Sequence, residues 1–150
     1  MKLFLDTNIL LEYFCNRAQA RVVEKILQYI EEKKMEGYIS VGSFYTIIYL
    51  IDGHLKKSGL FNPERLALLR KILEGILTQF KVVSITDLQS AILDERFSDL
   101  EDSCQYYTAL SANCDFLLTL NERDFKNVIS NRICVLTPER FWTEYMNPIE

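Results

Sequence analysis

Four aspartates have the types and positions best suited to chemistry in this sequence: Asp6, Asp99, Asp102 and Asp124. Each stands at the end of an apolar, strand-like segment or at the start of a predicted helix. In parallel α/β proteins, these strand and helix ends meet at one edge of the sheet, where ligands bind. Carboxylates that meet there repel one another unless a cation neutralises them, and hard oxygen ligands suit Mg²⁺ or Mn²⁺. The pattern predicts a divalent-metal site for phosphoryl transfer.

The elements that must position these aspartates alternate along the chain. Continuous apolar segments are typical of buried parallel strands, and apolar residues at helical spacing indicate helices. Strand–helix alternation predicts an α/β fold in one domain, 1–150, with a mostly parallel central sheet and helices on both faces. The predicted strands are Lys2–Leu5, Tyr38–Val41, Phe80–Ile85, Asp115–Thr119 and Ile133–Leu136. The predicted helices are Ile9–Phe14, Ala18–Lys34, Ser43–Leu55, Pro63 to about Leu77, Asp87–Asp94, Asp99–Ala112 and a C-terminal helix from Pro138.

Local residues predict where the helices begin and end. Thr7 or Asn8 is expected to cap the first helix. Asn62 is expected to cap the fourth helix, with Pro63 at its first position. Gly37 is expected to end the second helix.

Composition indicates an ordinary soluble protein. The chain has 150 residues, 49% hydrophobic and 25% charged, which suits one domain with a sizeable core. No apolar segment approaches the ~20 residues that span a bilayer, and Asp6 interrupts the apolar N-terminus, so we expect a cytoplasmic protein with no membrane partner. The net charge of −4 argues against electrostatic binding of nucleic acid over a broad surface. It does not exclude nucleic acid as a substrate.

Several other chemistries lack the residues they need. The four cysteines form no CxxC pair, which favours free thiols over a zinc site or disulfides. His54 is the single histidine and lies in a polar segment, so the sequence offers few residues for a Ser-His-Asp or Cys-His catalytic mechanism. The sequence has five glycines in total and contains neither the glycine-rich phosphate-binding loop nor the glycine-rich dinucleotide-binding motif. A phosphatase or another hydrolase on this layout is therefore disfavoured.

Each aspartate also has a purely structural interpretation. Asp6, Asp99 and Asp124 could cap helices, and Asp102 could complement a helix dipole. For each aspartate taken singly, the structural interpretation is as good as metal binding. That all four stand at the ends of predicted strands or helices favours the metal site. If Asp6, Asp102 and Asp124 do converge, repulsion should raise the pKa of at least one of them in the metal-free protein.

At these residues the chain resembles the PIN-domain ribonucleases, which include the toxins of VapBC-type toxin–antitoxin pairs. The matching segments are Leu5-Asp-Thr-Asn-Ile-Leu10, Ser98-Asp-Leu-Glu-Asp102, Thr119-Leu-Asn-Glu-Arg-Asp-Phe125 and Leu136-Thr-Pro-Glu-Arg-Phe141, in the family's order. The resemblance covers nearly the whole chain.

The resemblance implies an α/β/α sandwich and a Mg²⁺- or Mn²⁺-dependent endonuclease acting on RNA, leaving a 3′-hydroxyl and a 5′-phosphate. It assigns metal binding and catalysis to Asp6, Asp102 and Asp124. It also implies supporting roles for a second group of residues: Asn8, Asn121 and Thr119 beside the site, with Asp99 and Glu101 as auxiliary acids. A toxin of this type would have an antitoxin protein as partner.

One position departs from the family pattern. Many members carry a glutamate on the helix after the second strand, and Thr46 stands in its place. Glu12 or Glu36 would occupy the site if this alignment were shifted. Because ligand charge sets divalent-cation affinity, the departure leaves an alternative open, in which a catalytically weakened PIN-like module binds RNA or a protein without cleaving.

The same helix predicts an interface. Residues 44–51 are apolar on every side except at Thr46, and a helix of this kind is either central or at an interface. We therefore expect a homodimer or the capture of an antitoxin peptide through this helix.

Overall fold

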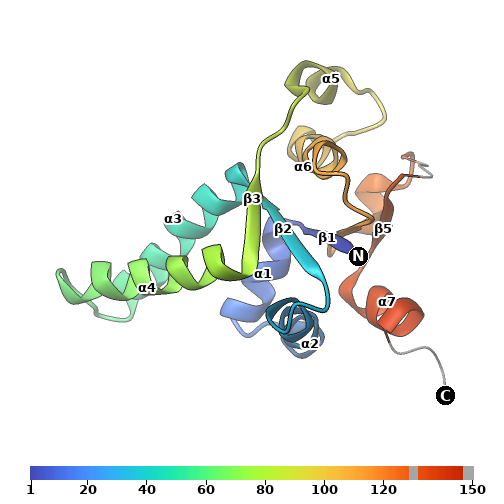
Figure 1. Cartoon of the computed structure of the whole chain (residues 1–150). Helices are drawn as coiled ribbons and strands as arrows, with labels where there is room; N and C mark the ends of the chain where they lie inside the picture. The colour runs from blue at the N-terminus through green and yellow to red at the C-terminus, as the bar shows by residue number, and fades with distance from the viewer. Residues whose placement is uncertain (129–131, 147–150) are drawn as a thin grey trace.

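The computed structural model describes residues 1–128 and 132–146 (Figure 1). Five parallel strands form one sheet in the order β3-β2-β1-β4-β5. These strands are β1 (Lys2–Leu5), β2 (Glu36–Ser40), β3 (Phe80–Val83), β4 (Phe116–Leu118) and β5 (Cys134–Leu136). The predicted strands and their parallel arrangement are confirmed.

Three strands end earlier than predicted. β4 ends at Leu118, one residue early, and the ends of β2 and β3 have local reasons. β2 ends at Ser40 because the Ser40 side chain accepts a hydrogen bond of 2.9 Å from the backbone N–H of Ser43, which starts the next helix at Val41. β3 ends at Val83, which pairs with Ser40. The predicted residues Ser84 and Ile85 therefore extend past the end of the neighbouring strand.

Helices connect the strands where the sequence predicted them. They are α1 (Thr7–Phe14), α2 (Ala20–Glu31), α3 (Val41–Lys57), α4 (Glu64–Gln79), α5 (Leu88–Leu93), α6 (Leu100–Ser111) and α7 (Pro138–Phe141). One short element was not expected, the 3₁₀ helix η1 (Glu122–Phe125), and the predicted C-terminal helix continues after α7 as the π-helix η2 (Trp142–Met146).

Three of the predicted helix caps and end signals are wrong. The N-cap of α1 is Asp6 rather than Thr7 or Asn8, because the Asp6 carboxylate accepts from the backbone N–H of Thr7. The N-cap position of α4 is Pro63, so Asn62 does not cap this helix. α2 ends at Glu31, and Lys33 adopts a left-handed backbone conformation (φ 58°) well before Gly37.

Gly37 has a different role, inside β2. A Cβ at this position would lie 2.8 Å from the Phe80 ring and 3.0 Å from Ile30. Only glycine therefore allows β2 to approach β3 and α2 this closely.

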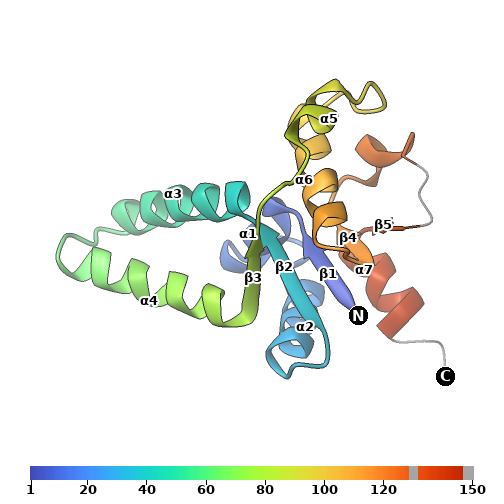
Figure 2. The same cartoon turned by 45° about the horizontal axis from the view of Figure 1, so that its top comes forward.

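The sheet separates two apolar cores, so the predicted three-layer sandwich is confirmed. Side chains alternate along β1: Leu3 and Leu5 pack toward α1, α2 and α3, whereas Phe4 packs with Tyr106 of α6. α5 and α6 lie on one side of the sheet in both views, and α1 and α2 lie on the other (Figures 1 and 2).

α3 and α4 form a helical pair that projects beyond the β3 edge of the sheet (Figure 2). Arg65 on α4 donates to Asp52 on α3 at 3.1 Å, which ties the two helices together. One face of α3 is buried through Ile47 and Ile51, while Tyr45 and Tyr49 on the other face are 66% and 78% exposed.

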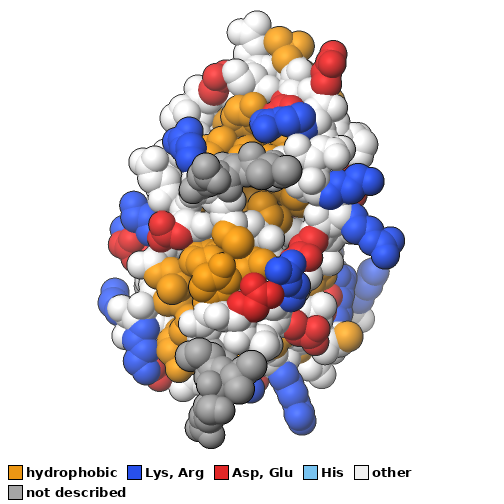
Figure 3. Space-filling view, turned by 90° about the vertical axis from the view of Figure 1, so that its right-hand side faces the viewer, with side chains coloured by type: hydrophobic (Ala, Val, Ile, Leu, Met, Phe, Trp, Pro, Cys, Tyr) orange, Lys and Arg blue, Asp and Glu red, His pale blue; other side chains and the backbone are white. Residues whose placement is uncertain are grey.

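The opposite edge of the sheet is β5. Apolar side chains are visible on this face between charged groups (Figure 3). None of the described helices is long and apolar enough to cross a bilayer.

Candidate metal centre

Asp6 lies directly after β1, at the switch point of the sheet. From β1 the strand order runs toward β2 and β3 in one direction and toward β4 and β5 in the other. Ligands bind in α/β proteins at the carboxyl ends of strands on either side of such a point. The hydroxyl of Thr119, the first residue after β4, donates to Oδ2 of Asp6 at 3.1 Å. This bond joins the ends of the two strands that flank the switch point.

The Asp6 carboxylate is buried, at 5% exposure, and is held by neutral donors. Its Oδ1 accepts from the backbone N–H of Thr7 at 2.8 Å and from Nε2 of Gln105 at 3.1 Å. A carboxylate has about four acceptor sites, so these bonds and that from Thr119 leave capacity for a further ligand. The donors orient Asp6 without neutralising its charge.

The start of α6 supplies the next carboxylates. Asp99 is the N-cap, and its Oδ1 accepts from the backbone N–H groups of Glu101 (2.9 Å) and Asp102 (3.2 Å). This confirms the capping interpretation of Asp99, which does not exclude a second role. One oxygen from each of Asp99, Glu101 and Asp102 lies within 4.8 Å of the other two.

Asp102 lies where the acidic residues meet. The pKa of Asp102 is raised to about 7. The largest cause is burial, followed by the charge of Asp99, the charge of Asp6, hydrogen bonding with Asp124 and the charge of Glu101. Asp102 is 8% exposed, so little solvent screens these charges. The expectation of a raised pKa in this group is confirmed for Asp102.

Glu101 and Asp124 complete the cluster. Burial first, and then the charges of Asp6 and Asp99, raise the pKa of Glu101 to about 7. Asp124 lies in η1, and Nδ2 of Asn121 donates to its Oδ2 at 2.6 Å.

The donor set fits a divalent cation. None of the ion pairs within residues 1–128 and 132–146 includes Asp6, Asp99, Glu101, Asp102 or Asp124. Buried carboxylates that no basic side chain neutralises are costly unless they take up protons or bind a metal. Hard carboxylate oxygens are the ligands that Mg²⁺ and Mn²⁺ prefer.

The tightest group of oxygens differs from the predicted set. It contains Asp102 with Asp99 and Glu101, whereas Asp6 and Asp124 approach Asp102 from the two neighbouring elements. Asp99 and Glu101 are therefore candidate ligands as well as auxiliary acids.

Three residues of this site were missed from the sequence. Nε2 of Gln105 donates to Asp6 and also faces the hydroxyls of Ser43 (2.7 Å) and Thr7 (3.3 Å). The hydroxyls of Ser43 and Thr7 are themselves 2.6 Å apart. Gln105 follows Asp102 by three residues, and this helical spacing was the available signal.

Thr46 and Asn8 make no such contacts. Thr46 is exposed, one turn after Ser43 on α3, and its hydroxyl donates to the backbone oxygen of Gly42. Asn8 is exposed at the second position of α1. On α3, Ser43 rather than Thr46 reaches the residues around Asp6.

Neither glutamate that would signal a shifted alignment takes this place. Glu12 accepts from the backbone N–H of Gln19 and joins α1 to the start of α2. Glu36 begins β2, at the opposite end of the sheet, and pairs with Lys81 at 2.9 Å.

Comparison with known proteins identifies the family. The model of the PIN domain matches residues 2–123. The chain belongs to the PIN-domain family. The match includes Asp6, Asp99, Glu101 and Asp102 but ends one residue before Asp124. No curated protein sequence matches the chain.

The fold is also similar to a solved structure. A chain in the crystal structure of VapBC2 from Rickettsia felis bound to a DNA fragment from their promoter superposes with a TM-score of 0.62 and 16% sequence identity. The similarity covers 91% of this PIN-domain chain and 98% of the other chain. At this identity the likeness concerns the fold alone.

Proposed function

We propose that this PIN-domain protein is a Mg²⁺- or Mn²⁺-dependent endoribonuclease. The observation that carries the proposal is the meeting of Asp6, Asp102 and Asp124 at the switch point of a parallel sheet, with no basic side chain paired to them among the described residues. Family membership supports the same chemistry.

The protein residues divide into ligands and residues that hold them. Asp6, Asp102 and Asp124 would bind the metal, with Asp99 and Glu101 as further oxygen donors. A bound divalent cation neutralises phosphate charge and lowers the pKa of a bound water. Thr119 and Gln105 orient Asp6 through their hydrogen bonds. Asn121 orients Asp124 in the same way.

We further propose that the protein is the toxin of a toxin–antitoxin pair. Support comes from the fold similarity to a chain of the VapBC2 complex. The exposed Tyr45 and Tyr49 on α3 offer an apolar surface for an antitoxin or for a second copy in a homodimer.

The alternative function is RNA or protein binding without cleavage. The observation that favours it is Thr46, which brings no charge and directs its hydroxyl to Gly42 of its own helix. The two functions differ in their response to added metal and to loss of a ligand.

Cleavage of single-stranded RNA with Mn²⁺ or Mg²⁺ tests the proposal. EDTA and Asp6→Asn should each abolish cleavage, because asparagine keeps the size and the helix-capping ability of aspartate but loses its charge. Asp87→Asn is the matched control, since Asp87 is an exposed N-cap of α5.

Two outcomes count against a nuclease. Cleavage that survives Asp6→Asn would come from a contaminant. If neither the natural protein nor Thr46→Glu cleaves RNA in excess Mn²⁺, the binding function is the better one.

A further inference from the structure

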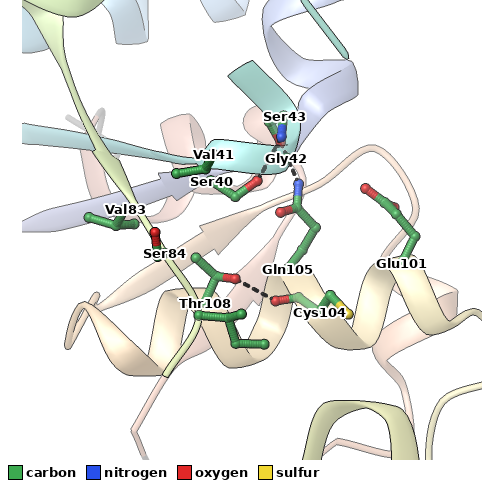
Figure 4. Close-up of a pocket in the computed structure, with 11 residues that line it drawn as sticks. Ser40, Val41, Gly42, Ser43, Val83, Ser84, Glu101, Cys104, Gln105 and Thr108 are labelled. Carbon is green, nitrogen blue, oxygen red and sulfur yellow. Dashed lines mark hydrogen bonds between the residues drawn. The ribbon is translucent and has the colours of Figure 1, made fainter. Parts of the chain in front are cut away.

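A pocket of about 270 Å³ opens beside the acidic cluster (Figure 4). One wall is formed by residues 40–43, where β2 passes into α3, and a second by residues 83–85, just after β3. One face of α6 forms the third wall. No residue of this pocket other than Ser43, Glu101 and Gln105 belongs to the candidate metal centre.

The pocket and the metal centre share Gln105. Its side chain is buried, at 4% exposure, and its Nε2 faces oxygens of Asp6, Thr7 and Ser43. Because the Asp6 carboxylate can only accept, the amide nitrogen must be the atom on that side. A group in the pocket therefore lies next to the residues that would hold the metal.

The opposite atom of the same amide faces the pocket. Oε1 of Gln105 is directed toward the space between Ser40 and Thr108 in Figure 4. It accepts no hydrogen bond from residues 1–128 or 132–146. A polar atom on a buried side chain is satisfied by a donor from a ligand or from water.

Thr108 supplies a second acceptor. The hydroxyl of Thr108 donates to the backbone oxygen of Cys104 at 2.7 Å, so toward the pocket it can only accept. The remaining lining includes the apolar side chains of Val41, Val83 and Ile85. The pocket is thus a small, partly apolar space in which Oε1 of Gln105 and Oγ1 of Thr108 are acceptors, with the hydroxyl of Ser84 and the thiol of Cys104 also in its lining.

We propose that this pocket binds one nucleobase of single-stranded RNA, next to the phosphate held at the metal centre, and prefers a base with an exocyclic amino group over uracil. This inference rests on the proposed RNA substrate. The volume lies just below the ~300–1,000 Å³ of pockets for drug-sized ligands, which suits a single heterocycle. Bases of single-stranded RNA are free to leave the stack and enter such a site.

The preference follows from the acceptors. Adenine, cytosine and guanine each offer an amino group that can donate to Oε1 of Gln105. Each of these amino groups has two N–H donors, enough for both Oε1 of Gln105 and Oγ1 of Thr108. Uracil has a single donor at this edge, N3–H between two carbonyl oxygens, so it can pair with one of the two acceptors and lacks a donor for the other. A site that hydrogen-bonds a donor rejects an analogue that lacks it.

Nucleoside titrations test the pocket separately from catalysis. We expect adenosine and cytidine, added to the ¹⁵N-labelled protein without metal, to shift the NMR signals of Gly42, Ser84 and the Gln105 side-chain amide saturably. Uridine should need at least a tenfold higher concentration, the loss expected for about 1.4 kcal/mol of hydrogen bonding.

Two glycines of α3 provide a matched pair of variants. A Cβ at Gly42 meets only Ser40 Oγ, at 3.8 Å, and a Cβ at Gly53 meets nothing within 4 Å, so both sites accept a side chain. Gly42 lines the pocket, whereas Gly53 does not. Gly42→Leu should weaken adenosine binding at least tenfold, and Gly53→Leu should leave it unchanged.

The outcomes separate this inference from the nuclease function. Equal binding of adenosine and uridine, or adenosine binding that survives Gly42→Leu, would overturn the base pocket even if the protein cleaves RNA. Selective adenosine binding that Gly42→Leu removes, in a protein that cleaves no RNA with any metal, would retain the pocket and overturn the nuclease.

Discussion

Asp102→Asn should stabilise the metal-free protein at neutral and alkaline pH. Burial and neighbouring carboxylates raise the pKa of Asp102 from 3.8 to about 7 in the folded state. Between these values the folded protein binds the extra proton, so stability falls as pH rises through this window. The two pKa values differ by about three units, and at ~1.4 kcal/mol per unit the full cost is about 4 kcal/mol.

The magnitude expected in an experiment is smaller. Of that cost, about 2.5 kcal/mol falls between pH 5 and pH 8, because part of it has already accrued at pH 5. Asparagine removes the charge, and its amide can donate to Asp124 as the protonated acid does. Between pH 5 and pH 8, the free energy of unfolding of Asp102→Asn should therefore fall much less than that of the natural protein. The raised pKa of Glu101 contributes in the same direction.

Urea unfolding in EDTA at pH 5 and pH 8 measures the effect. At pH 8, a divalent cation at about 100 times its Kd should raise the free energy of unfolding of the natural protein by about 2.7 kcal/mol. The same cation concentration should raise that of Asp102→Asn much less. Asp87→Asn should behave like the natural protein. The reasoning fails if the natural protein in EDTA is as stable at pH 8 as at pH 5. It also fails if Asp102→Asn is the less stable protein at pH 8.

Three further changes test other parts of the structure. Gln105→Leu should weaken Mn²⁺ binding about tenfold, measured by calorimetry, because Asp6 loses an orienting hydrogen bond of 3.1 Å; unchanged affinity would show that Thr119 and the backbone suffice. Thr46→Glu should tighten Mn²⁺ binding in the same assay by adding a carboxylate one turn from Ser43, and an unaltered Kd would place residue 46 outside the site. Gly37→Ala should lower the free energy of unfolding by about 1–3 kcal/mol, since its Cβ would lie 2.8 Å from the Phe80 ring; a neutral effect in urea would mean that the ring moves away freely.

The elements of the fold could be predicted from the sequence because their signals are local. The apolar segment before Asp6 forms β1 with the predicted bounds, and alternation with helices indicated the parallel sheet. The errors fall at boundaries. Asp6 rather than Thr7 caps α1, and β3 stops where its neighbour β2 stops.

The candidate site divides in the same way. Asp6, Asp102 and Asp124 were recognisable because acids at element ends form a pattern along the chain. Gln105 and Ser43 were not, since a glutamine on a helix and a serine near a cap have many ordinary roles. Their importance comes from contacts between residues 62 or 99 positions apart in the sequence.

The sequence by itself determined the strands, the helices and the acids that stand at their ends, because periodicity and capping involve residues within a few positions of one another. Only the tertiary structure decided that β4 pairs beside β1, which places Thr119 within 3.1 Å of Asp6 across 113 positions. It also decided the depth at which Asp102 is buried, and so its raised pKa. Strand order and burial depend on contacts between distant segments, and no local pattern specifies them.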